Sequence, residues 1–545
     1  MLRHQPIVFL LLMPIFGQAQ NDTLPLIKPL EIFEKVREFR SNEDYAGAVE
    51  LLKHIPESDT SYFLAQAELL VTYGVANDIN PAKALGARLT ATNNEYNATN
   101  FLEWGNAWLN AGDAEKGVEI YKKGLNRYPT HHMMHNNIGV AYFRLGQYAL
   151  AEDHLKECLS VSPFYSNAHI MLARIMILKG LRTKAIMSLM TYLAINPDDN
   201  SALIMLENLV NGANRLEGTL AADEINNDFY TIELLLRSKA PLDERFKTSV
   251  DFNASLVKYS TMLLENLIYN SESEDFWMRF YVPFYLKLHK QGLSTFFIYK
   301  LLSSTKNEKV SMWLKSHQKE NDAYVDLANK ELASTKFSKK ITLLGETKMF
   351  PVWYYSNGRV NAFGEQVDDD TRIGPWVIYY DNWEKSSIGK YSEDGKKIGD
   401  WFFYHKNGEL LRKEVYDENE RVIENVVYYD NEGRLSIEAP FSDGKLNGEL
   451  TYYMACGQVS EIQPYENGAN TGQGVVYYSS GQKYSAMQSQ DGSLEGTYDY
   501  YYKSGNLKTS YTYANNLRHG PFSSFHQNGS KDEQGAFFEG NETGD

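Results

Sequence analysis

Aromatic and glycine positions recur with a fixed period over the last 200 residues of the chain. Glycines follow one another at intervals of 25, 24, 24, 24 and 24 residues, at Gly408, Gly433, Gly457, Gly481, Gly505 and Gly529. An aromatic residue lies four positions before each of them: Tyr404, Tyr429, Tyr453, Tyr477, Tyr501 and Phe525. A short repeat of this kind predicts a stack of similar small units and not a compact enzyme domain.

Each of these units predicts two short strands and two turns. Residues 399–408 run as an aromatic strand into an Asn-Gly turn, and residues 409–416 return as a second strand. Asn-Gly between β-formers predicts a hairpin, because both residues tolerate positive φ. A second turn follows at pairs such as Asp443-Gly444. The pattern therefore predicts an antiparallel meander extended along one axis.

This plan resembles the bacterial variant of the membrane occupation and recognition nexus (MORN) repeat. The resemblance covers about residues 350–545 and is best at 399–419 and 496–516. Some units depart from it: Trp383 replaces the first turn glycine, Glu420 and Asn516 replace the second, and Ser489 replaces an aromatic. We interpret these departures as drift in a structural array. The resemblance also implies the antitoxin-like (YwqK-type) description that bacterial families of this kind often carry.

One face of the predicted sheet carries a row of tyrosines. The row consists of Tyr404, Tyr429, Tyr453, Tyr477 and Tyr501. Large exposed aromatic rows usually bind a ligand, so these five are candidate partner-binding residues. The alternative is that their rings stack across strands and stabilise the sheet by about 0.5–1 kcal/mol per pair.

A second repeat, with a period of 34 residues, lies between residues 98 and 199. Its markers are Pro129, Pro163 and Pro197 together with Gly112, Gly146 and Gly180. Small and aromatic residues alternate in the first half of each unit, as in Gly105 to Trp108 and Gly139 to Tyr142. These units resemble tetratricopeptide (TPR) repeats, which implies stacked helical hairpins with a groove lined by the first helices.

The resemblance to TPR repeats places four candidate partner-binding residues in that groove: Asn106, Asn136, Asn137 and Arg174. The TPR subfamily that binds C-terminal carboxylates needs basic residues where this chain has Leu102, Asn167 and Met171. That activity is therefore not carried over. The alternative to a peptide site is a solvated groove without a ligand.

The patterns together predict an α+β multidomain repeat protein, an N-terminal α-solenoid followed by a C-terminal antiparallel β-hairpin array. The expected segments are a signal peptide at 1–19, degenerate helical repeats at 20–97, TPR-like repeats at 98–215, a helical region at 216–345, either diverged repeats or a packing domain, and MORN-variant repeats at 346–545. The leader prediction rests on an apolar run at 7–16 and on small residues before Gln20. It makes the expected location periplasmic or secreted.

Charge and residue usage narrow the function classes. The net charge of −16 argues against nucleic acid and anionic membrane surfaces as partners. No later stretch reaches 18 apolar residues, so no transmembrane segment is expected. The two cysteines, Cys158 and Cys456, fall in different predicted domains and are expected to remain separate thiols.

No catalytic motif stands out. His131, His132 and His135 cluster after Pro129, but no carboxylate or cysteine nearby in sequence completes a metal set. We therefore expect neither cofactor nor metal nor enzymatic activity. The sequence favours an exported protein-protein interaction scaffold that binds a peptide or helix in its groove; the alternative is a module that binds cell-envelope glycan on the tyrosine row. It does not indicate the oligomeric state.

Overall fold

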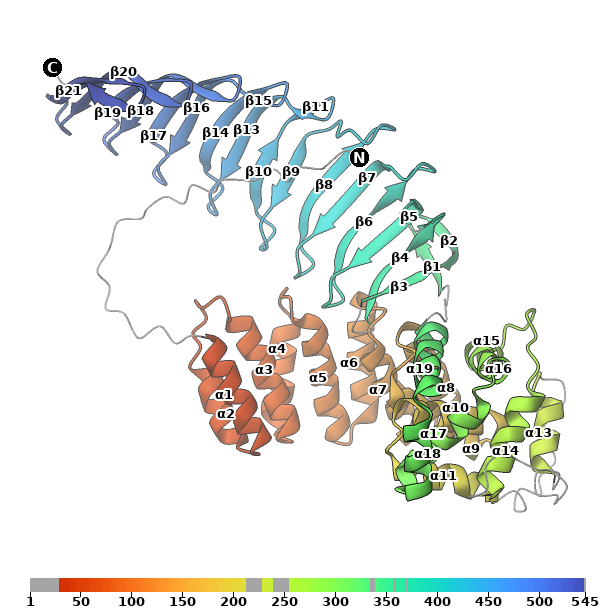
Figure 1. Cartoon of the computed structure of the whole chain (residues 1–545). Coiled ribbons are helices and arrows are strands. Elements are labelled where there is room, and N and C mark those ends of the chain that lie inside the picture. Colours follow the sequence, from red (N-terminus) through yellow and green to blue (C-terminus); the bar gives the residue numbers. More distant parts are fainter. Residues whose placement is uncertain are drawn as a thin grey trace.

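The computed structural model describes residues 29–211, 228–238, 254–333, 339–355, 359–368 and 370–543. It confirms the α+β prediction: helical hairpins come first and an antiparallel strand array follows (Figure 1). The predicted signal peptide at 1–19 lies outside the described residues.

The helices form an almost continuous series along the first part of the chain. They are α1 (Pro29–Ser41), α2 (Tyr45–Lys53), α3 (Tyr62–Val75), α4 (Ile79–Thr90), α5 (Asn97–Asn110), α6 (Ala114–Arg127), α7 (His132–Arg144), α8 (Tyr148–Val161), α9 (Ser166–Leu178), α10 (Arg182–Ile195), α11 (Asn200–Asn211), α13 (Tyr230–Arg237), α14 (Ala254–Asn266), α15 (Phe276–Phe280), α16 (Val282–Lys290), α17 (Ser294–Leu301), the 3-10 helix η3 (Ser303–Thr305), α18 (Glu308–Ser316) and α19 (Gln318–Ala333).

The 34-residue period corresponds to helical hairpins. Gly112, with φ of 85°, follows the end of α5 in the left-handed conformation that stops a helix. Gly105 lets α5 and α6 approach, because a Cβ there would lie 2.3 Å from the Tyr121 ring. The glycines thus end a helix or allow two helices to pack closely, as their spacing predicts.

The helices after α11 pack back onto the hairpins. The Tyr281 hydroxyl lies 2.8 Å from Nδ1 of His169, and the Tyr285 hydroxyl lies 2.6 Å from that of Thr191. Trp277 and Phe280 are buried in the same hydrophobic core as α9 and α10. Helices α13 to α19 therefore share one core with the repeats.

The strands follow in sequence order. They are β1 (Lys339–Leu343), β2 (Glu346–Phe350), β3 (Val352–Tyr354), β4 (Val360–Gln366), β5 (Arg372–Tyr379), β6 (Lys385–Tyr391), β7 (Lys397–Tyr404), β8 (Leu410–Tyr416), β9 (Val426–Tyr429), β10 (Leu435–Ala439), β11 (Phe441–Ser442), β12 (Lys445–Leu446), β13 (Gly448–Tyr453), β14 (Val459–Glu466), β15 (Ala469–Asn470), β16 (Gly472–Tyr477), β17 (Lys483–Gln490), β18 (Ser493–Tyr501), β19 (Leu507–Ala514), β20 (Leu517–Phe525), β21 (Lys531–Phe538) and β22 (Asn541–Thr543).

Neighbouring strands pair antiparallel, with a register shift where each first strand ends. In β7 and β8, for example, Gly399 pairs with Tyr416 and Tyr404 pairs with Leu410. Figure 1 shows the array running as a curved sheet from β3, beside the helices, to β21 at its far end.

The two turns of a unit differ in conformation. Both residues of Asp443-Gly444 have positive φ, 51° and 77°, as a type I′ hairpin requires. In the Asn407-Gly408 turn only the glycine has positive φ, at 86°. The Gly408 N–H donates to the His405 carbonyl at 2.9 Å, which is typical of a type I turn followed by a left-handed residue. The hairpin predicted from Asn407-Gly408 is therefore present, and of its two turn residues the glycine alone uses positive φ.

Side chains just after the first strand join consecutive units. The Tyr380 hydroxyl donates to the Tyr404 carbonyl at 2.8 Å, and the Tyr478 hydroxyl donates to the Tyr501 carbonyl at 2.8 Å. Asn382 makes a similar bond from its amide to the Lys406 carbonyl at 2.7 Å. Tyrosines that follow the first strand and the turn asparagine thus link several consecutive units of the array.

Candidate functional site

A tryptophan joins the two arrays. Trp383 occupies the turn between β5 and β6 at the place where the repeat has glycine, and its φ is 67°. Its side chain is 4% exposed and belongs to the hydrophobic core of the helices. The ring stacks on His131, at the start of α7, with centroids 4.0 Å apart and planes 27° apart. The Arg359 guanidinium covers it at 4.1 Å.

The interpretation of Trp383 as drift was therefore wrong. A bulky residue in the left-handed region is strained, and such strain persists only where the surrounding structure compensates for it. Here the compensation is burial of an indole ring between helices. The departure from the repeat pattern marks the turn that docks the array.

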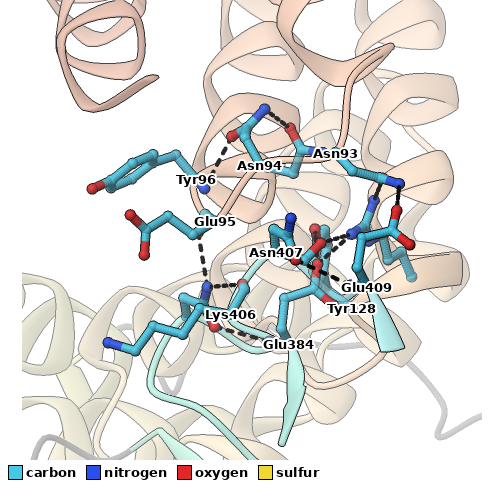
Figure 2. A network of polar contacts seen from close by, with 12 residues as sticks. Asn93, Asn94, Glu95, Tyr96, Tyr128, Glu384, Lys406, Asn407 and Glu409 are labelled. Carbon is cyan, nitrogen blue, oxygen red and sulfur yellow. Dashed lines mark hydrogen bonds and ion pairs between the residues drawn. The ribbon is translucent and has the colours of Figure 1, made fainter. Parts of the chain in front are cut away.

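A polar network lies around Glu384, the residue after Trp383 (Figure 2). The Arg127 guanidinium at the end of α6 pairs with the buried Glu384 carboxylate at 2.6 Å and donates to the Asn407 carbonyl at 2.6 Å. The Tyr128 hydroxyl donates to Glu384 at 2.8 Å. Burial and the adjacent Glu384 carboxylate both raise the pKa of the Tyr128 phenol, so the phenol remains a donor. Asn93, from the loop before α5, bonds to Glu409.

A third contact secures the first strands of the array. Val161, the last residue of α8, lies in a hydrophobic cluster with Phe350, Val360 and Tyr379. The Tyr354 hydroxyl donates to the Ser160 carbonyl at 3.0 Å. Apolar, stacking and charged contacts join the helices to separate turns and strands of the β array. The two arrays are therefore packed against each other and are not merely connected by a linker.

The histidines predicted as a polar cluster belong to this junction. Nδ1 of His131 accepts the Met134 N–H at 3.3 Å and so caps α7. Burial lowers the pKa of His131 well below its usual range, aided by His132 and the Arg359 cation; burial lowers the pKa of His132 to about 4. Both rings are neutral at pH 7. Within the described ranges, no three His, Cys, Asp or Glu side chains gather as a metal-ligand set.

The cysteines are apart, as expected. Cys158 is a buried free thiol in the helical core, and Cys456 is an exposed free thiol on the array. Burial raises the pKa of the Cys158 thiol well above its usual range, so it is not a thiolate at neutral pH.

A chain of amides crosses the first helices of three consecutive hairpins. Asn167 of α9 donates to Asn136 of α7 at 3.2 Å, and Asn136 donates to Asn137 at 3.0 Å. Asn137 then donates to Asn106 of α5 at 2.8 Å, and Asn106 donates to Glu103 at 3.1 Å. We call these five residues the polar row.

The polar row contains three of the four predicted groove residues. Asn106 and Asn137 are half-buried, as expected for groove residues. Asn136 is only 1% exposed and therefore connects its neighbours instead of facing a ligand, which corrects its assignment. Arg174 of α9 is exposed and lies outside the row. Glu103 was missed by sequence reasoning, although its place one turn before Asn106 on the same helix face could have indicated it.

Two hollows are lined by residues of the helical repeats. A cavity of about 470 Å³ between α9 and α11 is lined mainly by apolar side chains: Ile177, Ile204, Met205 and Leu209, with Arg182, Ser201 and Asn208. A second cavity, of about 290 Å³, lies where the arrays meet, and residues from both line it: Glu95, Tyr96, Ala98, Thr99, Arg359, Asp381, Asn382, Trp383 and Lys406. Thr99 lies one helical turn before Glu103, so this seam cavity continues the face of the polar row.

The predicted tyrosine row is present but half-buried. Tyr404, Tyr429, Tyr453, Tyr477 and Tyr501 are all of intermediate exposure. Among the described residues, no ring contact links successive members of this row, so the predicted cross-strand stacking of these rings is not what holds the sheet. Tyr453 instead donates from its hydroxyl to Glu438 at 2.6 Å.

A family model, the tetratricopeptide repeat, matches residues 134–165. This range corresponds to α7 and α8, so the prediction of TPR repeats is confirmed there. No curated protein matches the chain. Within the described part of the chain, no helix is both long and apolar enough to cross a membrane.

Several solved TPR-type structures are similar to part of the chain. A thermophilic TPR protein of Thermus thermophilus is 19% identical, with 32% of this chain and 95% of that one covered and a TM-score of 0.29. PilW, a type IV pilus biogenesis factor, is 19% identical over 39% of this chain and 94% of that one, with a TM-score of 0.30. The C-terminal part of a TPR repeat-containing protein from Cytophaga hutchinsonii is 15% identical over 51% and 97%, with a TM-score of 0.29.

Proposed function

We propose that this chain is an exported, non-enzymatic scaffold that binds an extended segment of a protein partner along the first helices of its TPR repeats. The TPR fold indicates protein-protein interaction. The polar row is the observation that supports binding of an extended segment. An extended peptide brings backbone N–H and C=O groups that must find partners when they leave water.

The amides of the polar row have bonding capacity left for such groups. A side-chain amide has two N–H donors and two acceptor lone pairs. In the bonds described, Asn137 donates once and accepts once, which leaves one donor and one acceptor. Asn106 accepts from both Tyr121 and Asn137 and donates to Glu103, which leaves one donor. The apolar cavity beside α11 would receive a hydrophobic side chain of the same segment.

The β array would extend the contact surface. Its MORN-like units are held at a fixed orientation by the Trp383 junction, and the seam cavity offers groups from both arrays to one partner. Fixed orientation lowers the entropy lost on binding, because no domain motion has to be frozen.

Placing a photo-crosslinking amino acid in the full-length chain tests the groove. We expect Val140, half-buried on α7, to crosslink a defined protein from envelope extract, and Lys123, exposed on the second helix α6, not to do so. The crosslink should fall at least about fivefold when Asn106 and Asn137 are both changed to Ala, because each lost backbone hydrogen bond weakens binding by about 1 kcal/mol. Equal crosslinking at both positions, or none at Val140, would refute the groove proposal.

The proposed export can be tested separately. The apolar run and the small residues before position 20 support cleavage by a signal peptidase. Expressed in a bacterium with its full N-terminus, the chain should be recovered from outside the cytoplasm with Gln20 as its first residue. Recovery of the uncleaved chain in the cytoplasmic fraction would contradict export.

Glycan binding on the tyrosine row is the second candidate. The observation in its favour is that the five phenols recur once per unit on one face and keep part of their surface exposed. Sedimentation of the full chain with insoluble cell-wall glycan, lost when Tyr404, Tyr429 and Tyr453 are changed to Ala, would establish this candidate in place of the scaffold.

A further inference from the structure

All the hydrogen bonds of the polar row point in one direction. Each amide donates to the next, from Asn167 through Asn136, Asn137 and Asn106, and the last acceptor is the Glu103 carboxylate. A chain of donors that ends on a carboxylate stabilises negative charge at its end, since successive hydrogen bonds polarise one another. The row therefore presents an anion at the α5 end of the face.

Glu103 has no cation beside it in the part of the chain that the structure describes. Among these residues its carboxylate forms no ion pair and accepts one hydrogen bond, from Asn106 at 3.1 Å. An ionised carboxylate offers about four acceptor positions on its two oxygens. Burial raises the pKa of Glu103, and the hydrogen bond from Asn106 offsets only part of that rise. Arg144, the cation near Tyr121, instead donates to the Leu109 carbonyl at 3.2 Å.

Helix α3 presents a glycine to this carboxylate. Gly74, near the end of α3, has no side chain, and a Cβ at its position would be in van der Waals contact with Oε2 of Glu103, at 3.4 Å. Glu103 and Asn106 are three residues apart on one helix, so both can contact one bound segment. Thr99, one turn earlier, continues the same face into the seam cavity.

We propose that Glu103 selects a partner segment that carries a lysine or arginine side chain, which pairs with the carboxylate while the segment's backbone bonds to Asn106 and Asn137. This inference rests on the proposed groove function and adds the chemistry of the partner. A cationic side chain fills the vacant acceptor positions with charge-assisted hydrogen bonds, which are about twice as strong as neutral ones. A segment with an acidic residue at that position would be repelled.

Selection from a random nonapeptide phage library tests this on the full-length chain. On the wild type we expect enrichment of peptides with Lys or Arg at one fixed position. Synthetic versions of the enriched peptides should bind Glu103→Gln about 10 to 100 times more weakly, because a hydrogen bond to a charged group is lost. Glutamine keeps the shape and the bond from Asn106, so the fold is preserved. Replacing the basic residue of the peptide by norleucine should cause the same loss on the wild type and little further loss on Glu103→Gln.

Two controls separate this inference from the proposed function. Glu119→Gln removes an exposed carboxylate from the outer helix α6 and should leave peptide affinity unchanged. Asn137→Ala should weaken every groove peptide, basic or not. If enriched peptides depend on Asn137 but show no basic position, or bind Glu103→Gln equally well, the Glu103 proposal is wrong while the groove function stands. If no enriched peptide depends on Asn137, both are wrong.

Discussion

Changing Trp383 to Gly releases the β array from the helices while each array keeps its own fold. The substitution removes an indole that is 4% exposed and stacked on His131. Truncating a buried tryptophan typically costs about 3–5 kcal/mol. Relief of the strained φ of 67° returns about 1–2 kcal/mol of that, so we expect the docked state to lose about 1–4 kcal/mol. Small-angle X-ray scattering should show a larger radius of gyration, and calorimetry should resolve two transitions in place of one.

Glu420→Gly is the matched control for this experiment. Glu420 also replaces a turn glycine of the repeat, with φ of 63°, but its side chain is exposed. Restoring glycine there should relieve strain without loss of any packing, so the radius of gyration and the single transition should be retained. An unchanged scattering profile for Trp383→Gly would mean that the polar network and the Val161 cluster hold the arrays together without the tryptophan.

Trp383 and Glu420 also show what could not be predicted from the repeat period alone. Each replaces a turn glycine, Trp383 in the first turn of its unit and Glu420 in the second, and the period alone gives both departures the same interpretation. What distinguishes them is the partner: the Trp383 turn meets His131 and Arg127, which lie about 250 residues earlier in the chain. A break in the period does not tell which distant residues the substituted side chain contacts, so the junction could not be predicted.

Within each array, prediction succeeded where the constraint is local. A single helical hairpin needs a left-handed residue after its first helix, and Gly112 provides it. It also needs a small residue where its two helices cross, and Gly105 provides that. The hairpin at Asn407 was also predicted, but its type of turn was not. Asn-Gly is compatible with two hairpin turns, and the asparagine is retained here for side-chain bonds, including one from its amide to the next unit at Asn431. Asn136 bonds to Asn137 beside it and to Asn167 of the next repeat, and the contact with the next repeat is not apparent from the spacing.

Acidification weakens the junction, because His131 and His132 are held neutral in it. Burial depresses the pKa of His132 from 6.5 to about 4 and that of His131 well below 6.5. When the junction opens, both rings regain ordinary values near 6.5 and bind protons. The open state therefore binds more protons between about pH 6.5 and pH 4, so the docking free energy is fully present above pH 6.5 and declines as the pH falls toward 4. His132 alone accounts for about 2–3 kcal/mol over that window.

The groups that face the two histidine rings disfavour their protonated forms. Arg359 adds a positive charge, and the Trp383 and Tyr165 rings exclude water. Scattering and calorimetry between pH 7.5 and pH 4.5 should show the wild type separating into two transitions at low pH, as Trp383→Gly does at neutral pH. Replacing both histidines with Asn keeps a capping side chain at position 131 and removes the titration, so that variant should undock far less on acidification. His169, whose pKa burial also lowers to about 4, lies in the helical core and should shift the helical transition equally in all variants. Undocking that tracks pH to the same extent in the double variant would mean that the junction histidines are not its cause.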